Sequence, residues 1–163
     1  MGCSWLRNLV GYSLTEDELK DIPNPRTELL FHVTFRSVQL TSFVGFAIVA
    51  PVVTLIKQPR TVIALRTRVM KYAVYGLIPG TVLGPALYYA RMRHQPEEGY
   101  FDRCYRLRHN KNQVRIDRMS ILGTLAGGLI GVFTPYGAIE AAVLGMYSGI
   151  LLASAYSYSP CGC

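Results

Sequence analysis

Long apolar runs without a charged side chain alternate with short polar segments along most of this chain. Charge-free runs cover residues 37–56, 72–90, 119–137 and 141–163. A helix needs roughly 20 apolar residues to cross a bilayer core of about 30 Å. The pattern therefore predicts an all-α membrane protein, a bundle of four transmembrane helices at about 37–56, 72–90, 119–133 and 138–156.

The segments between these runs predict where the helices begin and end. Thr134-Pro135-Tyr136-Gly137 is a turn signal, so the third and fourth helices are expected to form a tight antiparallel hairpin. Glu140 then falls in the first turn of the last helix, where the helix dipole favours an anion. Residues 61–71 are expected to be a short basic connector, and residues 91–118 a long charged loop.

A polar N-terminal leader is predicted for residues 1–36, ahead of a membrane domain at 37–157 and a C-terminal tail at 158–163. In the leader, Thr15 is followed three residues later by Glu18. This spacing predicts a capping box that opens a short helix. Pro23 and Pro25 are expected to stop that helix.

Composition and charge agree with a membrane protein. Half of the residues are hydrophobic and 17% are charged, whereas soluble domains average about 25% charged. The net charge of +7 comes from 17 basic and 10 acidic residues. The basic residues flank the apolar runs, which suits lipid headgroups better than a nucleic-acid duplex. A nucleic-acid partner is therefore not expected, and the apolar runs lack the polar stripe of a soluble helix.

Glycine recurs at every fourth position in the apolar runs. Spacing of four residues places these positions on one helix face, where the lack of a side chain lets a second helix approach closely. We therefore predict a helix-packing role for Gly76, Gly80, Gly84, Gly123, Gly127, Gly131, Gly145 and Gly149. The first run has a related series of Ser37, Thr41 and Gly45. A glycine-lined groove for a lipid or a translocating chain is the alternative.

Basic residues also cluster between the second and third apolar runs. The cluster consists of Arg103, Arg106, Arg108, Lys111, Arg115 and Arg118. Such a cluster next to membrane helices can hold anionic headgroups, including cardiolipin, or dock an acidic face of a partner subunit. The alternative is a solvated loop that helps to set the membrane topology.

The chain shows no pattern that predicts catalysis. We expect no catalytic residue, no metal site and no cofactor, because nucleotide loops, metal-ligand clusters and nucleophile motifs are missing from the sequence. Cys161-Gly162-Cys163 is too closely spaced for a zinc pair. These cysteines, with Cys3 and Cys104, are interpreted as free thiols, with a disulfide as the alternative.

The last two apolar runs carry a recognisable series of small residues. The series comprises Leu122-Gly123, Ala126-Gly127-Gly128-Leu129, Gly131, Tyr136-Gly137, Ala141-Ala142 and Gly149-Ile150. It resembles the mitochondrial inner-membrane import translocase family, and within it most the accessory subunit of respiratory complex I that shares the four-helix fold. The resemblance extends over about residues 35–157.

The resemblance implies a location and a role. It implies a multi-pass protein of the mitochondrial inner membrane, a non-catalytic accessory subunit of the membrane arm of complex I whose partners are other membrane-arm subunits. The alternative is a subunit of a protein import translocase. A small-solute carrier is disfavoured because such proteins usually carry ionisable residues inside the membrane.

Overall fold

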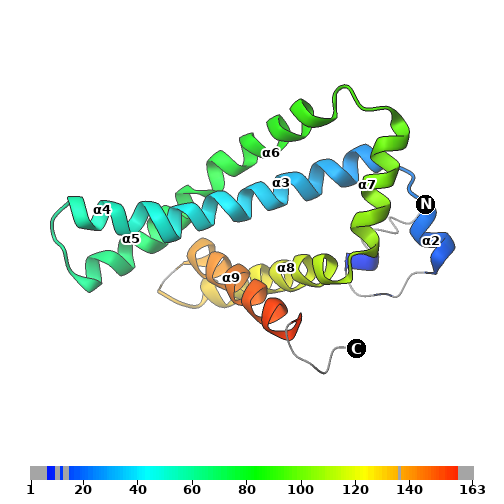
Figure 1. The fold of residues 1–163 in the computed structure, drawn as a ribbon. Helices are drawn as coiled ribbons and strands as arrows, with labels where there is room; N and C mark the ends of the chain where they lie inside the picture. The colour runs from blue at the N-terminus through cyan, green and yellow to red at the C-terminus, as the bar shows by residue number, and fades with distance from the viewer. Residues whose placement is uncertain (1–6, 10–11, 13–14, 136, 158–163) are drawn as a thin grey trace. The chain divides into compact units, whose positions relative to one another are not determined.

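The computed structural model of the protein describes residues 7–9, 12, 15–135 and 137–157, and its regular structure there is helical (Figure 1). The elements are α2 (Glu16–Lys20), α3 (Pro25–Val44), the π-helical turn η1 (Gly45–Val49), α4 (Ala50–Ile56), α5 (Val62–Tyr75), α6 (Leu77–Met92), α7 (Glu97–His109), α8 (Lys111–Val132) and α9 (Ala138–Ser157). They form two compact units. Unit 1 comprises Met1–Glu28 and Pro96–Cys163, and unit 2 comprises Leu29–Gln95.

Unit 2 is built on one long helical rod that packs against α5 and α6. The rod comprises α3, η1 and α4, and it runs without a break from Pro25 to Ile56, with its first four residues, 25–28, assigned to unit 1. The π-helical turn η1 ends at Val49, two residues before Pro51, and the N–H of Ala50 bonds to the carbonyl of Gly45, five residues back. The π-helix is rare in proteins and occurs mostly as such single turns inside longer α-helices.

The predicted connector at 61–71 is wrong, because these residues belong to α5. Thr61 caps that helix, and its hydroxyl accepts from the N–H of Ala64 at 3.2 Å. Arg68, one of the basic residues assigned to the connector, turns back from α5. Its guanidinium donates to the backbone carbonyls of Lys57 (3.1 Å), Gln58 (2.9 Å) and Pro59 (3.3 Å). These hydrogen bonds satisfy the carbonyl groups of the tight turn after α4.

The predicted loop at 91–118 is also wrong. Residues 97–109 form α7, and the first two turns of α8 follow after Asn110. Acidic residues begin α7 and basic residues end it, an order that matches the helix dipole. The side chain of Asn110 accepts from the N–H of Gln113 at 3.1 Å and caps α8. A high density of charge does not make these segments loops, because they carry helix-start signals.

Three local predictions are confirmed. Thr15 and Glu18 form a capping box at the start of α2, in which each side chain accepts from the other residue's backbone N–H. The chain turns between α8 and α9, where Gly137 has a φ of +83°, a left-handed conformation that favours glycine. Glu140 lies in the first turn of α9.

The predicted bundle of four membrane-spanning helices is wrong. Two helices are long and apolar enough to cross a membrane, Pro25–Ile56 and Ala138–Tyr156. The second predicted span is divided at Gly76, and α6 keeps 16 residues, about 24 Å. In α8, charged residues fill the first two turns, so the apolar part at 119–132 measures about 21 Å. Both lengths fall short of a bilayer core.

The two apolar helices are largely uncovered. Within their most apolar stretches, 28% of Pro25–Ile56 and 22% of Ala138–Tyr156 is buried. The predicted start of the membrane domain at residue 37 falls inside α3, which begins twelve residues earlier. The predicted tail at 158–163 lies outside the described residues.

Candidate functional site: glycine faces and a basic pocket

The glycines of α8 and α9 meet one another in a regular antiparallel register. A Cβ atom placed on Gly123 would collide with the carbonyl oxygen of Gly145, and one placed on Gly145 would collide with the carbonyl oxygen of Gly123. Farther along, a Cβ atom on Gly127 would meet the Ala141 carbonyl and one on Gly149 the Met119 carbonyl. Figure 1 shows the two helices side by side. The two backbones therefore touch where the glycines lie.

Gly131 closes this contact at the turn end of the pair. A Cβ atom on Gly131 would lie 2.7 Å from the Gly137 carbonyl oxygen and 2.8 Å from the Cα atom of Ala138. Gly128, next to Gly127, has a different environment. Its added Cβ atom would be 3.6 Å from the Cβ of Ala142, an ordinary van der Waals distance. The close face is therefore restricted to every fourth position.

The second glycine series lines the face that α6 turns toward α3. A Cβ atom on Gly76 would lie 2.7 Å from the Cα atom of Ser42, and one on Gly80 would lie 2.5 Å from the Cα atom of Val38. A Cβ atom on Gly84 would collide with the Cα atom of Thr34. The partners run backward along α3 as the glycine number rises, so this pair is also antiparallel.

Two residues of the series predicted at Ser37, Thr41 and Gly45 lie at contacts with α5 and α6. Gly45 lies against the carbonyl of Tyr72 in α5, and the Thr41 hydroxyl lies next to Gly80. Beside them, the fully buried Ser42 hydroxyl donates to the carbonyl of Ala73 at 2.8 Å. Sequence reasoning did not select Ser42, although its hydroxyl ties α3 to α5.

The six basic residues predicted to form one cluster have three different environments. Arg108 is buried and makes a two-bond ion pair with Glu28, with its Nε 2.9 Å from Oε1 and its Nη2 2.7 Å from Oε2. Its Nη1 donates to the carbonyls of Glu18, Leu19 and Asp21 at 3.0–3.4 Å. Arg108 thus joins α7 to the start of α3 and the end of α2.

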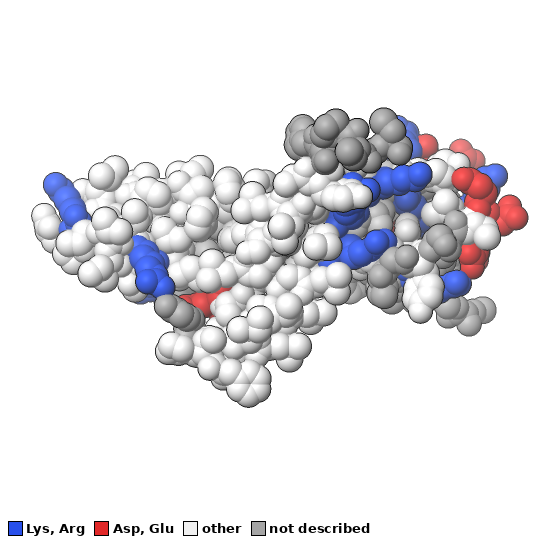
Figure 2. Space-filling view, turned by 90° about the horizontal axis from the view of Figure 1, so that it is seen from below, with Lys and Arg blue, Asp and Glu red and all other residues white. Residues whose placement is uncertain are grey.

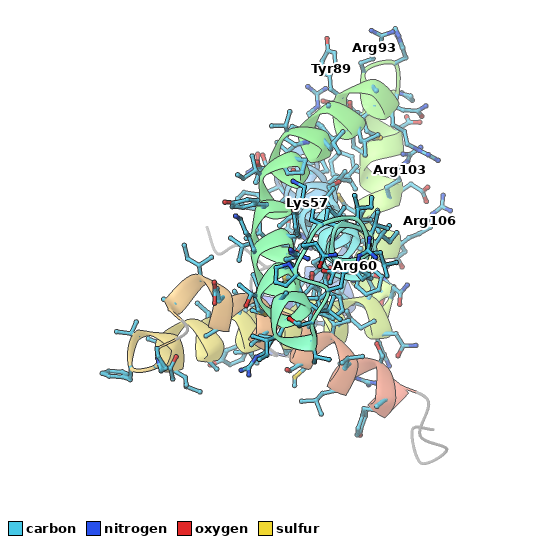
Figure 3. The ribbon with its side chains drawn as sticks, turned by 90° about the vertical axis from the view of Figure 1, so that its left-hand side faces the viewer. Lys57, Arg60, Tyr89, Arg93, Arg103 and Arg106 are labelled. Carbon is cyan, nitrogen blue, oxygen red and sulfur yellow. The ribbon has the colours of Figure 1, made fainter. Side chains whose placement is uncertain are left out.

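Arg103 and Arg106 lie on α7, where Figure 3 shows both side chains pointing outward. Arg106 forms an ion pair with Asp102, one turn earlier. Hydrogen bonding from Arg106 lowers the pKa of the Asp102 carboxyl, and the same bond raises the pKa of Arg106. Both groups of this pair are exposed, so solvent screens it.

The remaining three basic residues line one open pocket together with Arg108. The pocket has a volume of about 180 Å³ and is lined by Asn8, Arg108, Lys111, Val114, Arg115 and Arg118. Figure 2 shows Lys and Arg side chains gathered in this part of the surface. No Asp or Glu of the described residues lines it. The arrangement is chemically suited to an anion.

Besides Arg108, two of the pocket cations are held in place by neighbours. The Nε of Arg118 donates to the carbonyl of Leu9 at 2.9 Å, and its Nη2 donates to that of Asn8 at 2.8 Å. The guanidinium of Arg115 lies over the ring of Tyr156, 4.7 Å from its centroid. Sequence reasoning identified these cations but not their anchors, which lie far away in sequence.

Among the cysteines, Cys104 is buried on α7, and its Sγ donates to the carbonyl of Pro25 at 3.1 Å. Cys3, Cys161 and Cys163 lie outside the described residues. Within the described part of the chain, no group of three or more His, Cys, Asp or Glu side chains is placed to hold a metal ion.

Residues 5–158 match the model of the family described as "Protein of unknown function (DUF1757)". The match covers nearly the whole chain, and the protein belongs to this family. No curated protein matches the chain.

Proposed function

We propose that this member of the DUF1757 family is a non-catalytic accessory subunit of a mitochondrial inner-membrane complex, the membrane arm of complex I. In this proposal, the protein enters the bilayer through Pro25–Ile56 and Ala138–Tyr156, the two helices long and apolar enough to do so. It stabilises neighbouring membrane-arm subunits by packing against them.

The observation that carries the membrane part is the distribution of small and large side chains. In the α8–α9 pair, glycines occupy the contact, while Leu125, Leu129, Leu151 and Leu152 are each at least 60% exposed. A soluble protein places its large apolar side chains inside. Lipid is as apolar as leucine, so membrane helices associate through small residues and turn large ones outward. The α8–α9 pair has the arrangement of membrane helices, with small residues at the contact and large apolar side chains outside.

The assignment to complex I is supported by the resemblance of the last two apolar runs. The glycines that carry this resemblance, among them Gly123, Gly127 and Gly131, are the residues at which α8 and α9 touch. The outward apolar side chains of the same pair offer a surface that a neighbouring membrane subunit can cover. A closely packed helix pair with an apolar outer face suits an accessory subunit that packs against its neighbours.

Membrane insertion is tested by placing a charge on an exposed apolar position. Leu144→Arg, near the middle of α9, is expected to shift protein from the pellet to the supernatant in alkaline carbonate extraction. A charged residue at the centre of a membrane helix costs about 2.5–3.5 kcal/mol. Ile63→Arg is the matched control, because Ile63 is 80% exposed on α5, outside the two apolar helices. Release of the wild-type protein into the supernatant would contradict insertion.

Membership of complex I is tested by identifying the complex with which the protein migrates. The protein is expected to migrate with complex I on native gels, and its depletion is expected to lower the amount of assembled complex and NADH-driven respiration. The alternative, an import translocase subunit, predicts a different result. Depletion would then leave complex I intact and slow the import of a presequence-bearing reporter, which would overturn our choice.

A further inference from the structure

We infer that the pocket at the start of α8 is a binding site for a single phosphate group, which Lys111, Arg115 and Arg118 hold. The three cations come from one helix face, at positions i, i+4 and i+7. They line a pocket of about 180 Å³. One water molecule needs a cavity volume of roughly 10–15 Å³. A phosphate group with its remaining water shell therefore fits.

The charge of the pocket distinguishes it from the other basic residues. Arg108 makes a two-bond ion pair with Glu28, and Arg106 is paired with Asp102. Arg118 is instead oriented by two backbone carbonyls, which fix its guanidinium but leave its charge in place. Guanidinium groups in fixed positions recognise phosphate oxygens strongly, because donors that are already positioned lose little freedom on binding.

The location of the pocket indicates where the phosphate comes from. Arg115 stacks on Tyr156, which lies at the end of the apolar helix α9. An aromatic ring at the end of an apolar helix is typical of the headgroup level of a membrane. The start of α8 adds the positive end of a helix dipole to the pocket. A phospholipid headgroup and a free phosphate share this chemistry, and the experiment separates them.

The test uses the full-length protein in a nonionic detergent and two probes, phosphatidylglycerol and inorganic phosphate. Native mass spectrometry measures lipid affinity, with phosphatidylcholine, a zwitterionic lipid of zero net charge, for comparison, and calorimetry measures phosphate affinity. The pocket variant is Lys111→Gln with Arg115→Gln. The control is Arg103→Gln with Arg106→Gln, which removes the same charge from α7 outside the pocket.

The pocket variant is expected to bind its ligand about tenfold more weakly or worse, since hydrogen bonds to charged groups are the strong ones. The control is expected to change affinity by less than about threefold, because exposed charges are screened. Lys111→Gln alone is expected to give an intermediate loss. Lys111 is exposed at the first position of α8, so this variant keeps the test valid if loss of the Arg115–Tyr156 contact disturbs folding.

Each result is decisive. Selective loss of phosphatidylglycerol binding identifies a headgroup site, and selective loss of inorganic phosphate binding identifies a site for free phosphate. Equal weakening by the pocket and control variants would show a diffuse surface charge and overturn the inference. Lack of binding of both probes by the wild-type protein would also overturn it. These measurements do not depend on membership of complex I, so the native-gel experiment succeeds or fails separately.

Discussion

Gly127→Ala is expected to destabilise the α8–α9 pair strongly, and Gly127→Leu is expected to prevent accumulation of the protein. The added Cβ atom would collide with the Ala141 carbonyl oxygen and lie 3.2 Å from the Cα atom of Gly145. Both partners are backbone atoms, which can move only if the helices separate. Overpacking costs roughly 1–3 kcal/mol, and loss of a close small-residue contact in a membrane adds on the order of 1 kcal/mol.

The adjacent glycine provides the control for this prediction. Gly128→Ala adds the same atom one residue away, where its nearest neighbours are at 3.6 and 3.9 Å. Alanine is also favoured over glycine in a helix by about 1 kcal/mol, so Gly128→Ala is expected to be neutral or stabilising. Denaturant titration in detergent and steady-state levels measure both variants. Equal behaviour of the two substitutions would show that α8 and α9 do not meet at the Gly127 face.

Periodicity predicted the helices of this protein better than charge predicted its loops. The four-residue glycine spacing and the capping box of Thr15 and Glu18 are local signals, and the structure places a helix at each of them. The prediction of a four-span bundle was wrong because a run without charged residues can be shorter than a membrane-spanning helix. The first two turns of α8 are charged, so the apolar part that follows them is too short to cross a membrane.

The basic residues show why the site was harder to predict than the helices. Six cations close together in sequence were expected to act together, but α7 and α8 point them in different directions. The distinction depends in part on partners far away in sequence, such as Glu28 for Arg108, 80 residues away, and Leu9 for Arg118, 109 residues away. Helix spacing contained part of the answer, because Tyr100, Cys104 and Arg108 repeat at four residues on the buried face of α7.

Arg108→Gln is expected to unfold much of unit 1. The substitution would leave the Glu28 carboxylate buried without its two-bond partner, and the carbonyls of Glu18, Leu19 and Asp21 would lose their shared donor. Removing one member of a buried ion pair costs about 3–5 kcal/mol, a large part of the stability of a small domain. Limited proteolysis, read at sites in α2 and α7, measures this loss.

Two comparisons separate this effect from a general loss of charge. Arg106→Gln removes a cation two residues away on the same helix, from an exposed pair with Asp102, and is expected to leave the proteolysis pattern almost unchanged. The double variant Glu28→Gln with Arg108→Gln removes both buried charges. It is expected to be less destabilised than the sum of the single variants, because neither charge is left alone. Additive losses would mean that Arg108 acts only through the three carbonyls and that the ion pair contributes nothing.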